Sequence, residues 1–256
     1  MNSRAKVYQY ARPVKVAIVG GGFGGLCMAI KLREAGIEDF VLLEKAEQVG
    51  GTWRDNSYPG CACDVQSHMY SFSFEGNPDW SARYSGWNEI LDNVLGTTEK
   101  YGIQEKTRFN AEVCGAHFDQ DKALWTLDLK DGSQVVCQHW VLASGPLHVP
   151  QIPNFPGLDR FKGKVFHSSQ WDHDYDLTGK KVVSVGTGAS AIQYVPRIAP
   201  EVERLTVVQR TPGWIIPRDE RTYSKLTKTL FRRFPLLPKL PLVRPYRSNA
   251  SRVVAN

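Results

Sequence analysis

Two glycine-rich turns in this 256-residue chain could each bind the pyrophosphate of a nucleotide. The first, at residues 20–25, follows a short β-branched apolar run and precedes a helical pattern. Its glycines permit a tight turn, the close approach of a phosphate and close packing of the helix on the strand. The second turn, at residues 186–191, has the same setting. The sequence therefore predicts two dinucleotide sites, with electrons passing from one nucleotide to the other.

A charged residue follows the strand after each turn and indicates which nucleotide each site prefers. Glu44 can accept hydrogen bonds from a ribose diol and would repel a 2′-phosphate, so the first site favours FAD or NAD. Arg210 stands at the corresponding position of the second site. Its guanidinium can pair with the 2′-phosphate of NADP, so the second site favours NADPH over NADH.

The elements that must position these turns alternate between strands and helices. Apolar runs predict buried parallel strands at residues 14–19, 40–43, 180–185 and 205–208. Helical spacing predicts helices at residues 26–35, 88–101 and 191–198. Three further strands, at residues 112–118, 124–129 and 134–143, predict an antiparallel meander. The predicted fold class is α/β, with two Rossmann-like dinucleotide-binding units in three layers around a mostly parallel sheet, an added antiparallel β-meander, and a second unit that is incomplete.

Composition is that of an ordinary soluble globular protein, with 42% hydrophobic and 23% charged residues. The sequence contains no run of 18 apolar residues, so we expect no transmembrane helix. The polar N-terminus does not resemble a secretory signal. The five cysteines form no CxxC pair, so we expect free thiols, a cytoplasmic location and no metal site. Nine of the 32 Lys and Arg, but no Asp or Glu, lie in residues 221–256, so the basic charge belongs to the tail and nucleic-acid binding is not indicated.

Two further motifs narrow the class. One is F-x-G-x-x-x-H-x-x-x-W-D, formed by Phe161, Gly163, His167, Trp171 and Asp172. The other runs Gly-x-Trp, Tyr-Pro-Gly and Asp, formed by Gly51, Trp53, Tyr58, Pro59, Gly60 and Asp64. Together with the two glycine turns, they make residues 14–220 resemble the flavin-containing monooxygenases, and within these the Baeyer–Villiger monooxygenases.

The resemblance implies an FAD- and NADPH-dependent enzyme that inserts one oxygen atom of O2 into a ketone through a flavin peroxide. It implies FAD contacts from Gly20, Gly22, Gly24, Gly25, Glu44, Gly51, Thr52, Trp53, Asp64, Tyr70 and Val113. It implies NADP contacts from Gly186, Thr187, Gly188, Ser190, Ala191, Gln209 and Arg210. Asp64 would lie beside the flavin and the nicotinamide as a catalytic residue. The motif at residues 161–172 would be a linker that couples NADP binding to domain movement.

The resemblance also implies an FAD-binding domain at residues 1–150, completed by a later return of the chain, and the start of an NADP-binding domain at 151–222. The residues themselves indicate a third part, a basic, proline-containing tail at 223–256. An active-site arginine of the family has no match in this sequence.

Two alternative functions stay open. One is a flavin monooxygenase that oxygenates nitrogen or sulfur. The other is a truncated nucleotide-binding module without oxygenation activity, which needs a missing half or another chain. The tail could contact a membrane surface or cover such a half. Arg54 is expected at the surface, next to the FAD loop, and the substrate is not specified.

Overall fold

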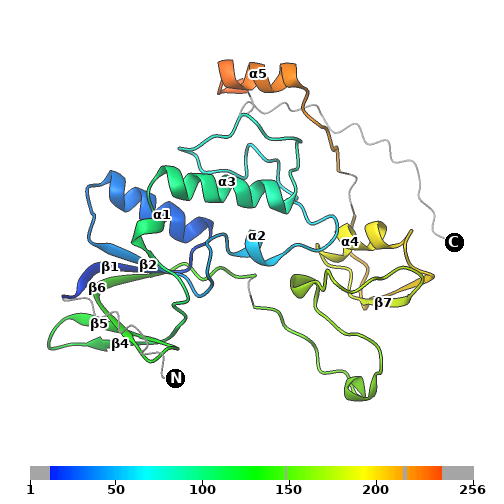
Figure 1. Ribbon diagram of the computed structural model, residues 1–256, viewed down its shortest axis with the longest axis horizontal. Helices are drawn as coiled ribbons and strands as arrows, with labels where there is room; N and C mark the ends of the chain where they lie inside the picture. Colours follow the sequence, from blue (N-terminus) through cyan, green and yellow to red (C-terminus); the bar gives the residue numbers. More distant parts are fainter. Residues whose placement is uncertain (1–11, 148, 216–217, 238–256) are drawn as a thin grey trace. The chain divides into compact units, whose positions relative to one another are not determined.

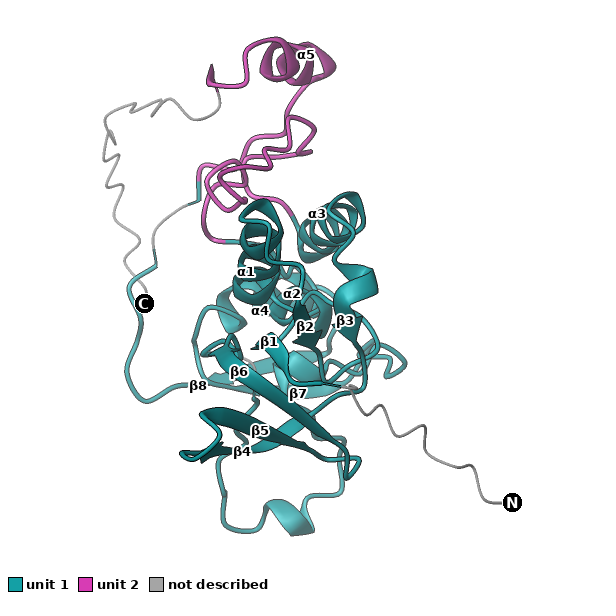
Figure 2. Ribbon diagram, turned by 90° about the vertical axis from the view of Figure 1, so that its left-hand side faces the viewer, with its two compact units in different colours: residues 1–63, 86–218 teal, residues 64–85, 219–256 magenta. Residues whose placement is uncertain are grey.

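The computed structural model describes residues 12–147, 149–215 and 218–237. Two compact units are distinguished in Figure 2, one of residues 1–63 and 86–218, the other of residues 64–85 and 219–256. Residues 1–11 of the expected polar N-terminus and residues 238–256 of the expected basic tail lie outside the described part. Both glycine turns belong to the first unit, and the predicted domain boundaries at 150 and 222 stay predictions.

The first unit contains a six-stranded sheet, in the order β3-β2-β1-β6-β5-β4 (Figure 1). The strands are β1 (Val14–Val19), β2 (Phe40–Leu43), β3 (Thr107–Arg108), β4 (Val113–Asp119), β5 (Leu124–Leu129) and β6 (Gln134–Leu142). Strands β3, β2, β1 and β6 are parallel, whereas β6, β5 and β4 pair antiparallel. Strand β6 therefore belongs to both patterns and joins the predicted meander to the parallel sheet.

Helices α1 (Phe23–Glu34) and α3 (Trp87–Lys100) lie on one side of the β1–β2 region (Figure 1). Strand β2 is buried at all four residues, as expected for a strand covered on both faces. Helix α1 contributes Leu26, Ala29 and Ile30, all fully buried. It ends before Gly36, whose φ of 75° lets the chain leave the helix without steric strain. The opposite side of the sheet buries a cluster of Val14, Ala17, Val41, Leu43, Ala111, Leu127, Leu129, Val135 and Cys137.

The second glycine turn lies between two parallel strands, β7 (Lys181–Val185) and β8 (Arg204–Val208), which form a separate two-stranded sheet. Helix α4 (Ala191–Ile198) follows the turn. Val183 and Val185 on β7 and Val207 and Val208 on β8 are 40–61% exposed. The two strands predicted for the start of the second Rossmann-like unit are therefore present. Within the described part of the chain, much of their apolar surface is exposed to solvent.

The second unit is built from the segment 64–85 and the chain after residue 218. The two segments pair through hydrogen bonds from the Arg83 amide to the Arg221 carbonyl oxygen and from the Tyr223 amide to the Ser81 carbonyl oxygen, each 2.8 Å. Ser224 is the N-cap of helix α5 (Lys225–Arg233), and its hydroxyl accepts a hydrogen bond from the Thr227 amide. A helix is thus present in the basic tail, whereas residues 64–85 form turns and isolated bridges.

Candidate functional site

The first glycine turn has two positions at which a side chain cannot fit. Gly20 has a φ of 108°, and a Cβ there would lie 2.5 Å from the Ala143 carbonyl oxygen at the end of β6. A Cβ on Gly25 would lie 1.9 Å from the Gly20 carbonyl oxygen. The backbone of helix α1 therefore packs directly against the turn that precedes it, as the glycine pattern predicts.

Gly22 and Gly24 border open space. A Cβ on Gly22 would meet only Gly51 Cα, at 3.9 Å, and a Cβ on Gly24 only Ala143 Cβ, also at 3.9 Å. Gly22 is the N-cap of α1, and no side chain caps that helix end. The amides and partial positive charge of a helix N-terminus favour a phosphate group. This end of α1 thus has the form and the charge that a pyrophosphate requires.

Glu44 follows β2 and is only 4% exposed. One carboxylate oxygen, Oε2, accepts a hydrogen bond of 2.7 Å from the Gly21 amide. The other, Oε1, accepts hydrogen bonds of 3.0 Å from the Ala46 amide and from Arg54 Nη1. Glu44 therefore fixes the backbone of the turn through Oε2, and that oxygen has a lone pair left for a further donor such as a ribose hydroxyl.

Arg54 is not a surface residue, contrary to the expectation from sequence. Its side chain is 13% exposed and pairs with both Glu44 and Asp55. Burial opposes the charge of the guanidinium, but the hydrogen bond to Asp55 and the charges of Glu44 and Asp55 outweigh burial and raise the pKa of Arg54. The sequence did not predict this ion pair, because Arg54 lies ten residues after Glu44. The two side chains meet only when the loop between them folds back.

The loop that carries Arg54 contacts the first turn directly. The Gly50 amide donates a hydrogen bond of 2.9 Å to the Gly21 carbonyl oxygen. Gly51 has a φ of 53°, and a Cβ there would lie 3.2 Å from Gly22 Cα. Short helix α2 (Thr52–Asp55) follows and buries Trp53. Of the predicted FAD contacts, Gly51, Thr52 and Trp53 are therefore brought to the glycine turn, because only glycine allows such close backbone approach.

The remaining predicted FAD contacts have different places. Val113 begins β4, two residues after Ala111, whose amide donates to the Glu44 carbonyl oxygen at 2.9 Å. Asp64 and Tyr70 belong to the second unit, where Asp64 is exposed and Tyr70 is half-buried. Their predicted contacts with the flavin, and the catalytic role of Asp64, stay predictions.

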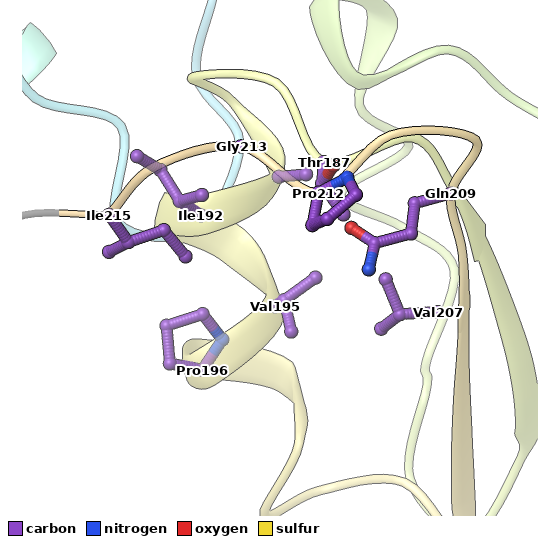
Figure 3. A pocket seen from close by; sticks show the side chains of 10 residues that line it. Thr187, Ile192, Val195, Pro196, Val207, Gln209, Pro212, Gly213 and Ile215 are labelled. Atoms are coloured by element: carbon purple, nitrogen blue, oxygen red, sulfur yellow. The ribbon is translucent and has the colours of Figure 1, made fainter. Parts of the chain in front are cut away.

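The second glycine turn is open. Gly186 has a φ of 99° and its amide donates to the Val208 carbonyl oxygen at 2.7 Å, while a Cβ on Gly186 or Gly188 would meet nothing within 4 Å. Ser190 is the N-cap of α4, and Ala191 is its first, buried residue. Thr187, Ala191 and Gln209 border a groove of about 340 Å3, which Figure 3 shows between α4 and the chain after β8. Arg210 follows β8 and is exposed. The predicted NADP residues are thus gathered around one turn and its strand end.

The predicted linker at residues 161–172 has its own local contacts. His167 Nδ1 accepts a hydrogen bond of 3.1 Å from the Ser169 amide and so caps the short 3-10 helix η3 (Ser168–Gln170). Asp172 pairs with Lys164 at 2.6 Å, and this hydrogen bond lowers the pKa of the Asp172 carboxyl. The Phe161 ring is 58% exposed and lies over Gly163, where a Cβ would be 2.6 Å from the ring. Trp171 packs against Tyr194 of α4, with ring centroids 5.3 Å apart.

A residue that no sequence pattern indicated is Gln193 of α4. Its side-chain amide forms hydrogen bonds with Tyr58 and with the backbone of Ala62.

Among the described residues, no group of three His, Cys, Asp or Glu could hold a metal ion. None of the described helices has both the length and the apolar character needed to cross a bilayer.

Comparison with known proteins identifies the family. The Flavin-binding monooxygenase-like (FMO-like) family profile matches residues 13–241. The chain belongs to this family. FMO-like relatives include a protein of Pseudomonas aeruginosa named Baeyer-Villiger monooxygenase, 52% identical over 230 residues, which cover 90% of this chain and 44% of the relative. A protein of the same name from Streptomyces coelicolor is 51% identical over 227 residues, 89% of this chain and 44% of its own length.

Solved structures of monooxygenases are similar to this chain. An oxidized steroid monooxygenase bound to NADP matches with a TM-score of 0.80 at 35% identity, over 87% of this chain and 43% of its own. A cyclohexanone monooxygenase from Rhodococcus sp. Phi1 bound to NADP+ matches with a TM-score of 0.80 at 33% identity, over 87% and 43% of the two chains. This FMO-like chain thus spans less than half the length of the relatives that it matches.

Proposed function

We propose that this chain provides the FAD- and NADPH-binding part of a Baeyer–Villiger monooxygenase, which inserts one oxygen atom of O2 into a ketone. The observation that carries the proposal is the pair of open glycine turns in one unit, the first followed by the buried carboxylate of Glu44 and the second by the exposed guanidinium of Arg210. Opposite charges at equivalent positions suit an unphosphorylated and a 2′-phosphorylated ribose. Relatives at about half identity bear the name Baeyer-Villiger monooxygenase.

The residues around the first turn suit FAD. The open backbone at Gly22 and Gly24 would receive the pyrophosphate, and Glu44 Oε2 would accept a hydrogen bond from the adenosine ribose. The loop at Gly51 and Trp53 would border the cofactor, because it already contacts Gly22. When bound, the flavin would supply the redox chemistry, and the protein would supply binding, orientation and exclusion of water.

The residues around the second turn suit NADPH. Thr187, Gly188, Ser190 and the start of α4 would receive its pyrophosphate, and Arg210 would pair with the 2′-phosphate, beside Gln209. We also propose that Asp64 acts beside the reacting rings, and that the linker containing His167 and Trp171 transmits NADP binding. Support for the linker is that Trp171 packs on Tyr194, in the helix that would bind the nucleotide.

The deciding experiment uses the purified chain. We expect yellow protein with bound FAD, which consumes NADPH and O2, and formation of an ester from a ketone in equal amounts would show that this part is sufficient for monooxygenation. Product analysis by mass spectrometry with a panel of cyclic, linear and aryl ketones would name the substrate class. Oxygenation of amines or sulfides alone would overturn the ketone assignment. Flavin binding with hydrogen peroxide as the sole oxygen product would leave nucleotide binding but overturn monooxygenation by this chain.

We further propose a cytoplasmic location, since all five cysteines are free thiols, including the exposed Cys114, which suits a reducing compartment. Cell fractionation with a membrane marker would test this location. Recovery of the protein with membranes would contradict it and would favour a membrane-surface role for the basic, apolar face of α5.

A further inference from the structure

The Tyr58-Pro59-Gly60 motif lies against helix α4, and this contact has a specific geometry. Gly60 has a φ of 79°, and a Cβ there would lie 2.9 Å from the Gln193 carbonyl oxygen and 2.9 Å from Arg197 Cγ. The loop can approach the helix backbone so closely only because residue 60 is glycine. A sequence motif that precedes Asp64 is thus a docking surface for the helix that follows the second glycine turn.

Gln193 makes the polar contacts across this interface. Its Nε2 donates a hydrogen bond of 2.9 Å to the Ala62 carbonyl oxygen, and its Oε1 accepts one of 3.2 Å from the Ala62 amide. The Tyr58 hydroxyl donates a third bond, 3.0 Å long, to the same Oε1. A side-chain amide that pairs with both polar groups of one residue fixes orientation as well as distance, as a second strand would.

The surrounding contacts join the linker to the same place. The Tyr194 ring meets the Tyr58 ring edge-on at 6.1 Å and packs on Trp171 at 5.3 Å. The Tyr194 hydroxyl lies 2.7 Å from Ser184 Oγ of β7. The Ser57 hydroxyl lies 2.7 Å from His173 Nε2, just after the linker. Loop 57–62, the linker end and the strand of the second turn therefore converge on one turn of α4.

We propose that Gln193 is a positioning residue that holds the second glycine turn in register with loop 58–62, and so aligns the two nucleotides for hydride transfer. The proposal rests on the proposed function, since the alignment matters only if both nucleotides bind. Gln193 lies within one helical turn of Ser190 and Ala191 at the start of α4. A rotation of α4 would move the bound NADPH relative to the loop, whereas the three bonds of Gln193 oppose such a rotation.

The test compares Gln193→Met, which keeps the length of the side chain but loses all three bonds, with the wild-type chain. Gln120→Met is the matched control, because Gln120 is exposed and lies in the turn between β4 and β5, away from α4. Hydrogen exchange of the Ala62 amide, measured by NMR without nucleotides, reads the contact itself. We expect Gln193→Met to speed this exchange about tenfold, while Gln120→Met leaves it unchanged.

Function is read by anaerobic reduction of the bound flavin with saturating NADPH. We expect Gln193→Met to lower the rate constant about tenfold, which is about 1.4 kcal/mol of barrier, with FAD affinity unchanged. Tyr58→Phe removes only the bond from the Tyr58 hydroxyl and keeps both bonds of Gln193 to Ala62, so we expect it to retain most of the Ala62 protection and of the rate. This graded loss separates positioning from a merely structural role and keeps the test decisive if Gln193→Met does not fold.

Each outcome has one meaning. Fast exchange of the Ala62 amide in the wild type would overturn the contact. Normal flavin reduction in a folded Gln193→Met with fast Ala62 exchange would overturn the alignment role alone. Failure of the wild-type chain to bind FAD or NADPH would overturn the proposed function instead, and the exchange data would still report whether Gln193 makes its contact.

Discussion

Arg54 Nη1 lies 3.0 Å from Glu44 Oε1, and both side chains are nearly buried, at 13% and 5% exposure. The pair joins the loop after Gly51 to the strand end that would receive the ribose. Arg54 also donates to the Gln48 carbonyl oxygen at 2.6 Å, so its guanidinium ties together three parts of the first site. Because Glu44 in turn binds the Gly21 amide, the arginine supports the glycine turn without touching it.

Replacing Arg54 by alanine should therefore destabilise the protein. Glu44 would keep its two backbone donors but lose the guanidinium of Arg54, and a buried carboxylate left unpaired typically costs about 3 kcal/mol. Urea unfolding, followed by fluorescence, measures the loss. Lys31→Ala, which removes a pair with Glu34 at the surface, is the control and should cost less than about 1 kcal/mol. Equal effects of the two substitutions would show that the burial of the Arg54 pair has no energetic weight.

The glycines of the first turn make a second contrast. Gly25→Ala would place a Cβ 1.9 Å from the Gly20 carbonyl oxygen, so the helix or the turn must move. We expect loss of FAD binding and a lower unfolding midpoint. Gly96→Ala in α3 meets nothing within 4 Å and should stabilise the chain by about 0.5–1 kcal/mol, because alanine is the better helix former. Flavin absorbance after dialysis and urea unfolding measure the two effects, and retained FAD in Gly25→Ala would contradict the packing argument.

A feature of this site could be predicted from the sequence only where the residues that form it lie close together along the chain. The glycine turns and the strand ends at Glu44 and Arg210 were predictable, because adjacent residues define them. The strands 14–19 and 40–43 coincide with β1 and β2, since short runs rich in apolar and β-branched residues, which end at Gly20 and Glu44, favour buried strands.

Contacts between distant segments were not predictable. Arg54 was expected at the surface because only the folded loop brings it to Glu44. Strand β6 could be recognised as the end of a meander, but its parallel pairing with β1 depends on the whole chain path. Gln193 gave no signal at all, since its partners Tyr58 and Ala62 are more than 130 residues away.

The exposed guanidinium of Arg210 should determine the choice of nicotinamide nucleotide. Arg210→Ala removes the charge that would pair with the 2′-phosphate, so we expect kcat/KM for NADPH to fall about tenfold or more, with little change for NADH. Flavin reduction rates with each nucleotide give both values. Arg204→Ala, at the exposed start of β8, is the matched control and should keep the preference. An unchanged NADPH-to-NADH ratio in Arg210→Ala would place the 2′-phosphate elsewhere.

His68 should make the second unit sensitive to acid. Its ring packs against Tyr223 and Phe231, with centroids 5.5 and 4.8 Å away, and its buried Nε2 has no hydrogen-bond partner among the described residues. Burial lowers the pKa of His68 below its usual value of about 6.5. The unfolded segment therefore takes up a proton at a higher pH than the folded one. It follows that the stability of this unit is fully present above about pH 6.5 and declines as the pH falls below that value.

The Tyr223 amide, which bonds to the Ser81 carbonyl oxygen, reports this opening. Between about pH 7.5 and about pH 5.5, a range in which Asp and Glu stay largely ionised, its hydrogen-exchange protection factor should decrease in the wild type. His68→Phe keeps an aromatic ring against Phe231 but cannot be protonated, so its protection should not change over the same range. His117→Phe, at an exposed position of β4 in the other unit, should behave as the wild type. A pH dependence that persists in His68→Phe would assign the titration to another group, and protection that rises toward acid pH would reverse the sign expected from a buried neutral imidazole.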